Sequence, residues 1–128
     1  MSNRSNKYKY LLAVFILFGS TQVFAGEELN AEKVKQLVVG HTMSAVHLNK
    51  DFEFKVYFDV DGKTAYRDQD GDTTKTTYKF EGNKHCIYWR GDDRCANIIK
   101  NDDGTYDRVN EDGDHVVQWS KIVKGKQL

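Results

Sequence analysis

Apolar and polar residues alternate with a period of two over most of the chain that follows Gly40. The pattern is clearest in "DFEFKVYF", residues 51–58, where every second side chain is apolar and most of the others are charged. This period is typical of a strand that buries one face. Similar segments predict further strands at residues 42–48, 64–67, 76–81, 84–90, 95–100, 105–109 and 115–123.

Turn signals separate these segments at nearly regular distances. Glycine recurs beside an Asp or Asn at positions 62, 71, 82, 91, 104 and 113. These residue types tolerate the positive φ that tight hairpin turns require. The spacing predicts a mainly β fold, an antiparallel up-and-down meander of about eight strands. Such a sheet must curve strongly or close into a small barrel to protect its edges.

A short helix is predicted ahead of the strands, in "LNAEKVKQLVVG" at residues 29–40. Asn30 is a suitable N-cap and Gly40 a natural residue just beyond the C-terminal cap. Val34, Leu37 and Val38 form an apolar stripe with helical spacing. We therefore expect this helix to pack over one end or one face of the sheet.

The first 25 residues have the organisation of a secretory signal peptide. A basic stretch, "MSNRSNKYKY", precedes an apolar run at residues 11–18 that is too short to span a membrane. Val23 and Ala25 are small residues at the positions that a signal peptidase reads, which predicts cleavage after Ala25. We expect a periplasmic or secreted protein with one domain, residues 26–128, and no stable membrane anchor after cleavage.

The charge of this domain argues against a nucleic-acid partner. Residues 26–128 keep 16 of the 19 basic residues and all 19 acidic ones, which gives a formal charge of −3. Nucleic-acid binding is driven by counterion release at a basic surface, and the sequence has no basic excess or stripe. We expect a monomer whose partner is an unknown small molecule or an envelope protein.

Cys86 and Cys95 are the two cysteines of the chain. A hairpin centred between Arg90 and Gly91 would place them opposite each other, so an oxidising compartment favours a disulfide. A redox-active pair is the weaker alternative, because the short Cys-x-x-Cys spacing is missing. A zinc site that adds His85 is disfavoured by the same oxidising conditions.

The stretch "YRDQDGDTTK", residues 66–75, places Asp68, Asp70 and Asp72 around Gly71. An EF-hand loop with Gly71 at its sixth position would have Tyr66 first and Thr77 twelfth, so both end ligands are missing. We therefore predict a hairpin turn and expect neither a metal nor another cofactor. A weak calcium contact at the three aspartates is the alternative that the sequence leaves open.

No catalytic pattern is visible along the chain. The histidines at positions 41, 47, 85 and 115 show no metal-ligand spacing, and Ser44 and Ser120 lie outside any Gly-x-Ser-x-Gly elbow. Nearly all the acidic residues lie in predicted turns, where water solvates them. Paired-carboxylate catalysis instead requires two desolvated carboxylates that face one cleft. We therefore expect a protein that is not an enzyme.

Aromatic side chains on the predicted strands are the remaining candidates for ligand contact. Trp89 and Trp119 lie beside aliphatic residues, which favours core packing for both. Tyrosine combines a stacking face with a polar end, as small-molecule sites often require. The weak ligand-binding candidates are Tyr57, Tyr66, Tyr78 and Tyr88.

Several motifs together resemble those of a family of small exported proteobacterial proteins classed as a domain of unknown function. They are a Gly-x-Thr motif after the helix, a tyrosine-rich strand before a DG turn, and a Cys-x-x-Trp hairpin that closes on a second cysteine. The matching residues here are Gly40, Thr42, Tyr57, Asp61, Gly62, Cys86, Trp89 and Cys95. One departure is Tyr78, which stands where many members have tryptophan. The resemblance implies a lipocalin-like small β fold and implies no known activity.

Two functions are compatible with these observations. The first is a binding module whose curved sheet encloses a pocket for a small ligand. The alternative is a protein-interaction or inhibitor module that acts through hairpin loops such as residues 90–93, and it predicts a filled barrel. A pocket inside the sheet distinguishes the two.

Overall fold

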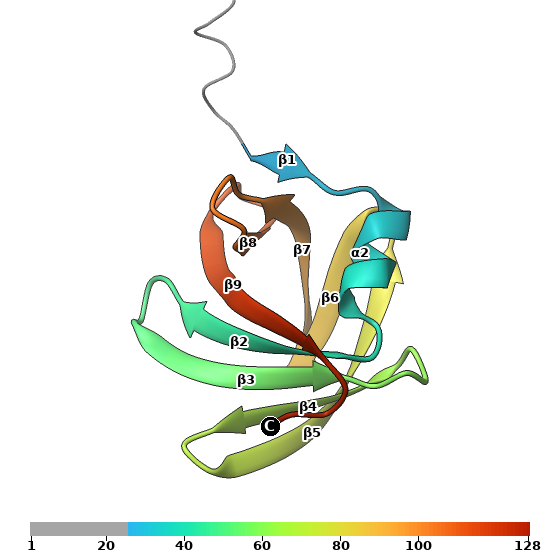
Figure 1. Cartoon of the computed structure of the whole chain (residues 1–128), viewed down its shortest axis with the longest axis vertical. Helices are drawn as coiled ribbons and strands as arrows, with labels where there is room; N and C mark the ends of the chain where they lie inside the picture. Colours follow the sequence, from blue (N-terminus) through green and yellow to red (C-terminus); the bar gives the residue numbers. More distant parts are fainter. Residues whose placement is uncertain (1–25) are drawn as a thin grey trace, which may run out of the picture.

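The computed structural model describes residues 26–128, and the predicted signal peptide lies outside the described residues. Eight antiparallel strands follow one another around a closed barrel (Figure 1). Each strand pairs with the next, and the last pairs with the first. The strands are β2 (His41–His47), β3 (Phe52–Phe58), β4 (Thr64–Gln69), β5 (Asp72–Glu81), β6 (Lys84–Trp89), β7 (Asp92–Lys100), β8 (Tyr106–Val109) and β9 (His115–Lys124). The predicted up-and-down barrel is confirmed.

Three of the hairpins turn within two residues, at 70–71, 82–83 and 90–91, and in two of them both turn residues have positive φ. Asp70 and Gly71 have φ of 54° and 88°, and Arg90 and Gly91 have φ of 52° and 89°. Two successive residues with positive φ are typical of a type I′ turn, whose twist matches that of the flanking strands. Strands β5 and β7 therefore begin at Asp72 and Asp92, earlier than their hydrophobic pattern predicts.

A ninth strand lies outside the barrel and was not predicted. β1 (Glu27–Glu28) pairs antiparallel with the end of β7, where Glu27 lies opposite Lys100 and Glu28 opposite Ile99. Two residues are too few to show a period of two, so the sequence carries no signal for this strand.

The predicted helix is confirmed as α2 (Ala31–Val38). The Asn30 side chain accepts a hydrogen bond of 3.0 Å from the backbone N–H of Lys33, and this interaction caps the first turn. Gly40 has φ of 81° and leads the chain into β2. Val34 and Val38 are fully buried, so the apolar stripe of α2 closes one end of the barrel (Figure 1).

The half of the barrel beneath α2 is filled by the hydrophobic core. Phe58 contacts the rings of Tyr78 and Trp119 at centroid distances of 5.0 and 6.2 Å. The placement of Trp119 in the core is therefore as the sequence predicts. The buried cluster comprises Leu29, Val34, Val38, Met43, Ala45, Val56, Phe58, Ala65, Tyr78, Ile98 and Trp119.

The predicted disulfide joins Cys86 of β6 to Cys95 of β7. The two residues are directly opposite in the register of this hairpin, and their Cα atoms are 3.9 Å apart. A disulfide in this position fits a compartment outside the reducing cytoplasm. Within residues 26–128, no helix has both the length and the apolar character to cross a membrane.

Candidate functional site

The half of the barrel that faces away from α2 is hollow. Its cavity has a volume of about 890 Å³ and opens between the hairpins at residues 48–51, 70–71, 90–91 and 110–114. The inward positions of the strands continue from the core into this space because side chains alternate between the two faces of a strand. The apolar part of the lining includes Phe52, Phe54, Val56, Ile87, Trp89 and Val117.

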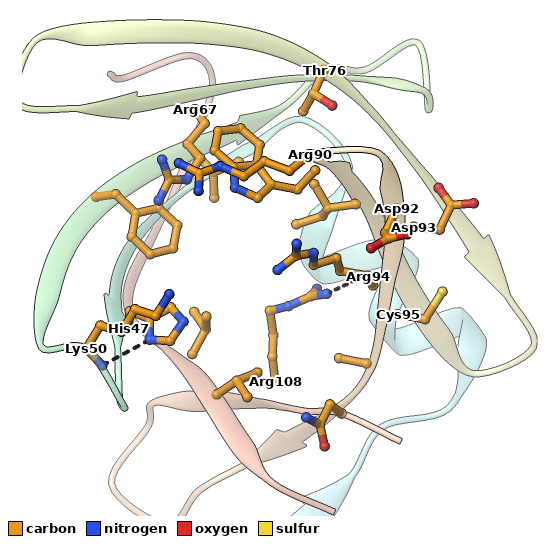
Figure 2. A pocket seen from close by; sticks show the side chains of 18 of the residues that line it. His47, Lys50, Arg67, Thr76, Arg90, Asp92, Asp93, Arg94, Cys95 and Arg108 are labelled. Atoms are coloured by element: carbon orange, nitrogen blue, oxygen red, sulfur yellow. Dashed lines mark hydrogen bonds between the residues drawn. The ribbon is translucent and has the colours of Figure 1, made fainter. Parts of the chain in front are cut away.

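Four arginines line the same cavity, and we call it the arginine cavity. Arg67 comes from β4, Arg90 from the β6–β7 turn, Arg94 from β7 and Arg108 from β8. Figure 2 shows the side chains of Arg67, Arg94 and Arg108 reaching into the opening from different walls. Among residues 26–128, none of the four arginines forms an ion pair with a carboxylate.

Arg108 is the deepest of the four, and only 5% of it is exposed. Its Nη1 donates a hydrogen bond of 2.6 Å to His85 Nδ1, and its Nη2 donates to the backbone oxygens of His85 and Arg94 at 3.3 and 3.0 Å. All three acceptors are neutral, so these hydrogen bonds do not balance the charge of the guanidinium. Burial lowers the pKa of Arg108 to about 10, which still leaves the guanidinium charged at neutral pH.

His85 is fully buried between this guanidinium and the core. A guanidinium can only donate, so His85 Nδ1 must accept and the ring proton lies on Nε2. Burial first, and then the charge of Arg108, hold the pKa of His85 well below its usual value. The imidazole is therefore neutral, and it orients Arg108 rather than competing with it for an anion.

The neutral state of His85 predicts a loss of stability in mild acid. The unfolded chain takes up a proton at this residue below about pH 6.5, whereas the folded chain does not. Stability that is present above this pH is therefore lost as the pH falls toward the folded pKa. Between about pH 6 and pH 5, the wild type should lose about 1 kcal/mol of unfolding free energy from His85.

Urea unfolding at these two pH values measures this loss. The His85→Gln variant keeps an acceptor for Arg108 but does not titrate, so it should lose about 1 kcal/mol less than the wild type. His47 also has a pKa lowered by burial, and His47→Gln serves as the control that retains the His85 contribution. An identical acid dependence in the wild type and His85→Gln would contradict this assignment.

The guanidinium of Arg67 lies over two aromatic rings. Its guanidinium carbon lies 4.3 Å from the centroid of Phe54 and 4.6 Å from that of Trp89. Its Nη1 also donates to Gln69 Oε1 at 2.9 Å. Burial, and then the neighbouring charge of Arg90, lower the pKa of Arg67. Trp89 therefore belongs to the cavity wall, whereas the sequence favours core packing for it.

Carboxylates occur only at the rim of the cavity, within the part of the lining that the structure describes. Two of them are engaged outside, since Asp93 pairs with Lys79 at 3.1 Å and Glu111 pairs with Lys84 at 3.7 Å. The rim carboxylates are all exposed and are therefore screened by solvent. They are Asp92, Asp93, Glu111 and Asp112.

None of the four tyrosines predicted as ligand contacts lines the arginine cavity. The rings of Tyr57 and Tyr66 stack on the outer face of the barrel, with their centroids 6.3 Å apart. Tyr88 is also outside, with 46% exposed, and Tyr78 is buried in the core, where its hydroxyl donates to the Asp59 carbonyl at 2.7 Å. Positions opposite the strongest apolar alternation face outward once the sheet closes around its apolar face.

The inward arginines escaped the sequence analysis, although the signal for them exists. Arg67 follows Ala65 at a spacing of two, and Arg94 precedes Ala96 at the same spacing, so both share a face with buried residues. A charged residue on the apolar face of a predicted strand is unusual. The alternation of apolar and polar residues is weak in these short segments, so the sequence did not show which face of the strand each arginine occupies.

The carboxylate oxygens of the three aspartates considered for calcium do not all lie within the short mutual distances of ligands that share one ion. Asp70 lies at the tip of the β4–β5 turn, and Asp68 accepts a hydrogen bond from the Thr73 hydroxyl at 3.2 Å. In residues 26–128, Glu81, Cys86 and Cys95 are the only group of three or more acidic, cysteine or histidine residues whose ligand atoms are close enough to share an ion. The two cysteines are bonded to each other, so their sulfurs are not thiolate ligands.

A carboxylate–imidazole pair lies on the outer face of β8 and β9. His115 Nδ1 is 2.7 Å from Asp107 Oδ2. Burial alone would raise the pKa of Asp107, but hydrogen bonds from Gln118, His115 and Asn101 outweigh it and lower the pKa. Within residues 26–128, no serine, threonine or cysteine side chain forms a hydrogen bond with His115.

Comparison with known proteins adds no family to this picture, because no family model, curated protein or solved structure matches the chain.

Proposed function

We propose that this protein is an exported, non-catalytic binding module that holds a small molecule in its barrel. Its place would be the periplasm or the outside of the cell, which the signal-peptide pattern and the Cys86–Cys95 disulfide support. The resemblance to small exported lipocalin-like proteins is consistent with this proposal.

The contrast between the two halves of the barrel is the observation that carries the proposal. One half is filled by large side chains, whereas the other half holds a cavity of about 890 Å³ that opens to solvent. Protein interiors are otherwise packed nearly without voids. A cavity of this size falls within the range of about 300–1,000 Å³ that small-molecule sites occupy.

The same contrast favours a pocket over the alternative of an interaction module that acts through its hairpin loops. That alternative requires a filled barrel beneath the loops, and here the loops surround an opening. His47 is the histidine of the cavity lining, and its Nδ1 accepts a hydrogen bond of 3.2 Å from the backbone N–H of Lys50 in the β2–β3 hairpin. Binding without reaction is therefore the function that the site supports best.

Two related dyes test whether the cavity admits a small molecule. N-phenyl-1-naphthylamine is neutral, and 8-anilinonaphthalene-1-sulfonate has the same rings with one added anionic group. Both fluoresce strongly when transferred from water to an apolar environment. The wild type should enhance the fluorescence of at least one dye with one site per chain, as measured by titration at neutral pH.

A variant that fills the cavity and a matched variant outside it complete this test. Ile87 faces the cavity and its neighbour Tyr88 faces solvent on the same strand. Ile87→Trp should reduce binding about tenfold or more because the larger ring occupies the site, whereas Tyr88→Trp should bind as the wild type does. Absence of binding of both dyes to the wild type, or equal binding by the two variants, would refute the proposed function.

A further inference from the structure

We propose that the arginine cavity is a receptor for an amphiphilic organic anion, whose anionic group binds Arg94 and Arg108 while its apolar body lies against the aromatic wall. This inference rests on the proposed function and assigns a chemical class to its ligand. The class covers carboxylates, sulfonates and phosphate monoesters that carry a flat or aliphatic apolar group.

The first argument is the uncompensated charge of Arg108. Taking an ion out of water is costly, and buried charges are normally paired with an opposite charge. Arg108 is nine-tenths buried and lines the cavity, yet its hydrogen bonds go only to an imidazole and two carbonyl oxygens. An anion that enters the cavity would supply the missing counter-charge in a low-dielectric site, where such a contact is strong.

The second argument is that the backbone of Arg94 lies next to the guanidinium of Arg108 in the cavity wall. Nη2 of Arg108 donates to the backbone oxygen of Arg94, and both side chains point into the same space (Figure 2). The Arg94 side chain makes no hydrogen bond or ion pair with residues 26–128. Planar guanidinium groups match the oxygens of carboxylate and phosphate groups, so the two residues form a suitable receptor.

The third argument concerns the part of the ligand that is not charged. Phe52, Phe54 and Trp89 line the wall from which Arg67 projects, and Ile87 and Val117 extend the apolar surface. A small inorganic anion would leave this surface exposed to water. An anion that carries an apolar body would cover it and gain the free energy of apolar burial.

The carboxylates at the rim do not neutralise the arginines. Asp92, Asp93, Glu111 and Asp112 are exposed at the hairpin ends, and two of them pair with lysines outside the cavity. Their charges are screened by solvent, whereas that of Arg108 is not. The acidic groups at the mouth of the cavity do not attract anions. Anion binding would therefore depend on contacts with Arg94 and Arg108 rather than on the charge of the rim.

The comparison of the two dyes isolates the contribution of the anionic group. At neutral pH, the wild-type protein should bind 8-anilinonaphthalene-1-sulfonate at least about tenfold more tightly than N-phenyl-1-naphthylamine. Added sodium chloride should weaken the sulfonate complex and leave the neutral complex nearly unchanged. Competition with 2-naphthoate, 2-naphthyl phosphate and 2-naphthylmethanol then identifies the preferred group, and the alcohol should be the weakest competitor.

Substitutions at the receptor locate the effect. Arg94→Met and Arg108→Met should each weaken the sulfonate complex about tenfold, with less than about a twofold change for the neutral dye. Lys121→Met removes the same charge from the exposed outer face of β9 and should change neither complex. Arg94 is exposed, and its side chain makes no hydrogen bond or ion pair within residues 26–128. Arg94→Met should therefore fold, and it still tests the receptor if Arg108→Met does not fold.

The outcomes separate this inference from the proposed function. A weaker sulfonate complex in Arg94→Met or in folded Arg108→Met, with Lys121→Met unchanged, supports the receptor. Equal wild-type affinity for the two dyes, or the same loss in Lys121→Met as in Arg94→Met, overturns the receptor while leaving a binding barrel. Failure of both dyes to bind the wild type overturns the proposed function itself.

Discussion

Replacement of Phe58 by alanine is expected to lower the free energy of unfolding by about 3–5 kcal/mol. Phe58 is completely buried, and its ring contacts those of Tyr78, His85 and Trp119 at centroid distances of 5.0, 4.7 and 6.2 Å. Its removal leaves a hole beneath α2 that these neighbouring rings cannot fill without leaving their rotamers. Urea unfolding of the wild type and Phe58→Ala at neutral pH measures the difference.

The control for this prediction is an aromatic residue on the outer face. Tyr88 is 46% exposed, so Tyr88→Ala should change the unfolding free energy by no more than about 0.5 kcal/mol. A loss below about 1 kcal/mol in Phe58→Ala would show that the half of the barrel under α2 is not tightly packed. The distinction between a filled half and a hollow half would then fail as well.

Loss of the disulfide is expected to cost about 2.7 kcal/mol of unfolding free energy in the double variant Cys86→Ala/Cys95→Ala. The cross-link closes a loop of about ten residues and thereby limits the conformations of the unfolded chain. Because the Arg90–Gly91 turn already pairs the two strands, the folded barrel should remain intact. Urea unfolding under oxidising conditions measures the loss.

Reduction of the wild type offers an independent check of the same quantity. With a thiol reductant present, the wild type should lose a similar amount of stability, whereas the double variant should be insensitive to the reductant. Equal stability of the oxidised wild type and the double variant would mean that the cross-link does not stabilise the fold.

The two halves of the barrel have different roles, and the same strands supply both. On β3, Phe58 packs in the core, while Phe52 and Phe54 lie on the same inward face and line the cavity. On β6, His85 is buried next to the core, while Ile87 and Trp89 face the opening. A rigid packed half can thus hold the cavity walls in place without being displaced by a ligand.

The sequence by itself determined the local features of this protein. The alternation in residues 51–58, the cap at Asn30 and the Asp-Gly turn at Asp70 and Gly71 act within a few residues, so composition and spacing suffice to predict them. The pairing of Cys86 with Cys95 was predictable for the same reason, since a single tight turn relates the two.

Only the tertiary structure decided which face of each strand became the interior and where that interior stayed hollow. Closure of the barrel turned Tyr57, Tyr66 and Tyr88 outward, and it brought Arg67 from β4 together with Arg94 from β7 and Arg108 from β8. These arginines are far apart in the chain, and no local pattern relates them. Their convergence depends on strand register and on closure of the sheet, which are properties of the whole barrel rather than of any one segment.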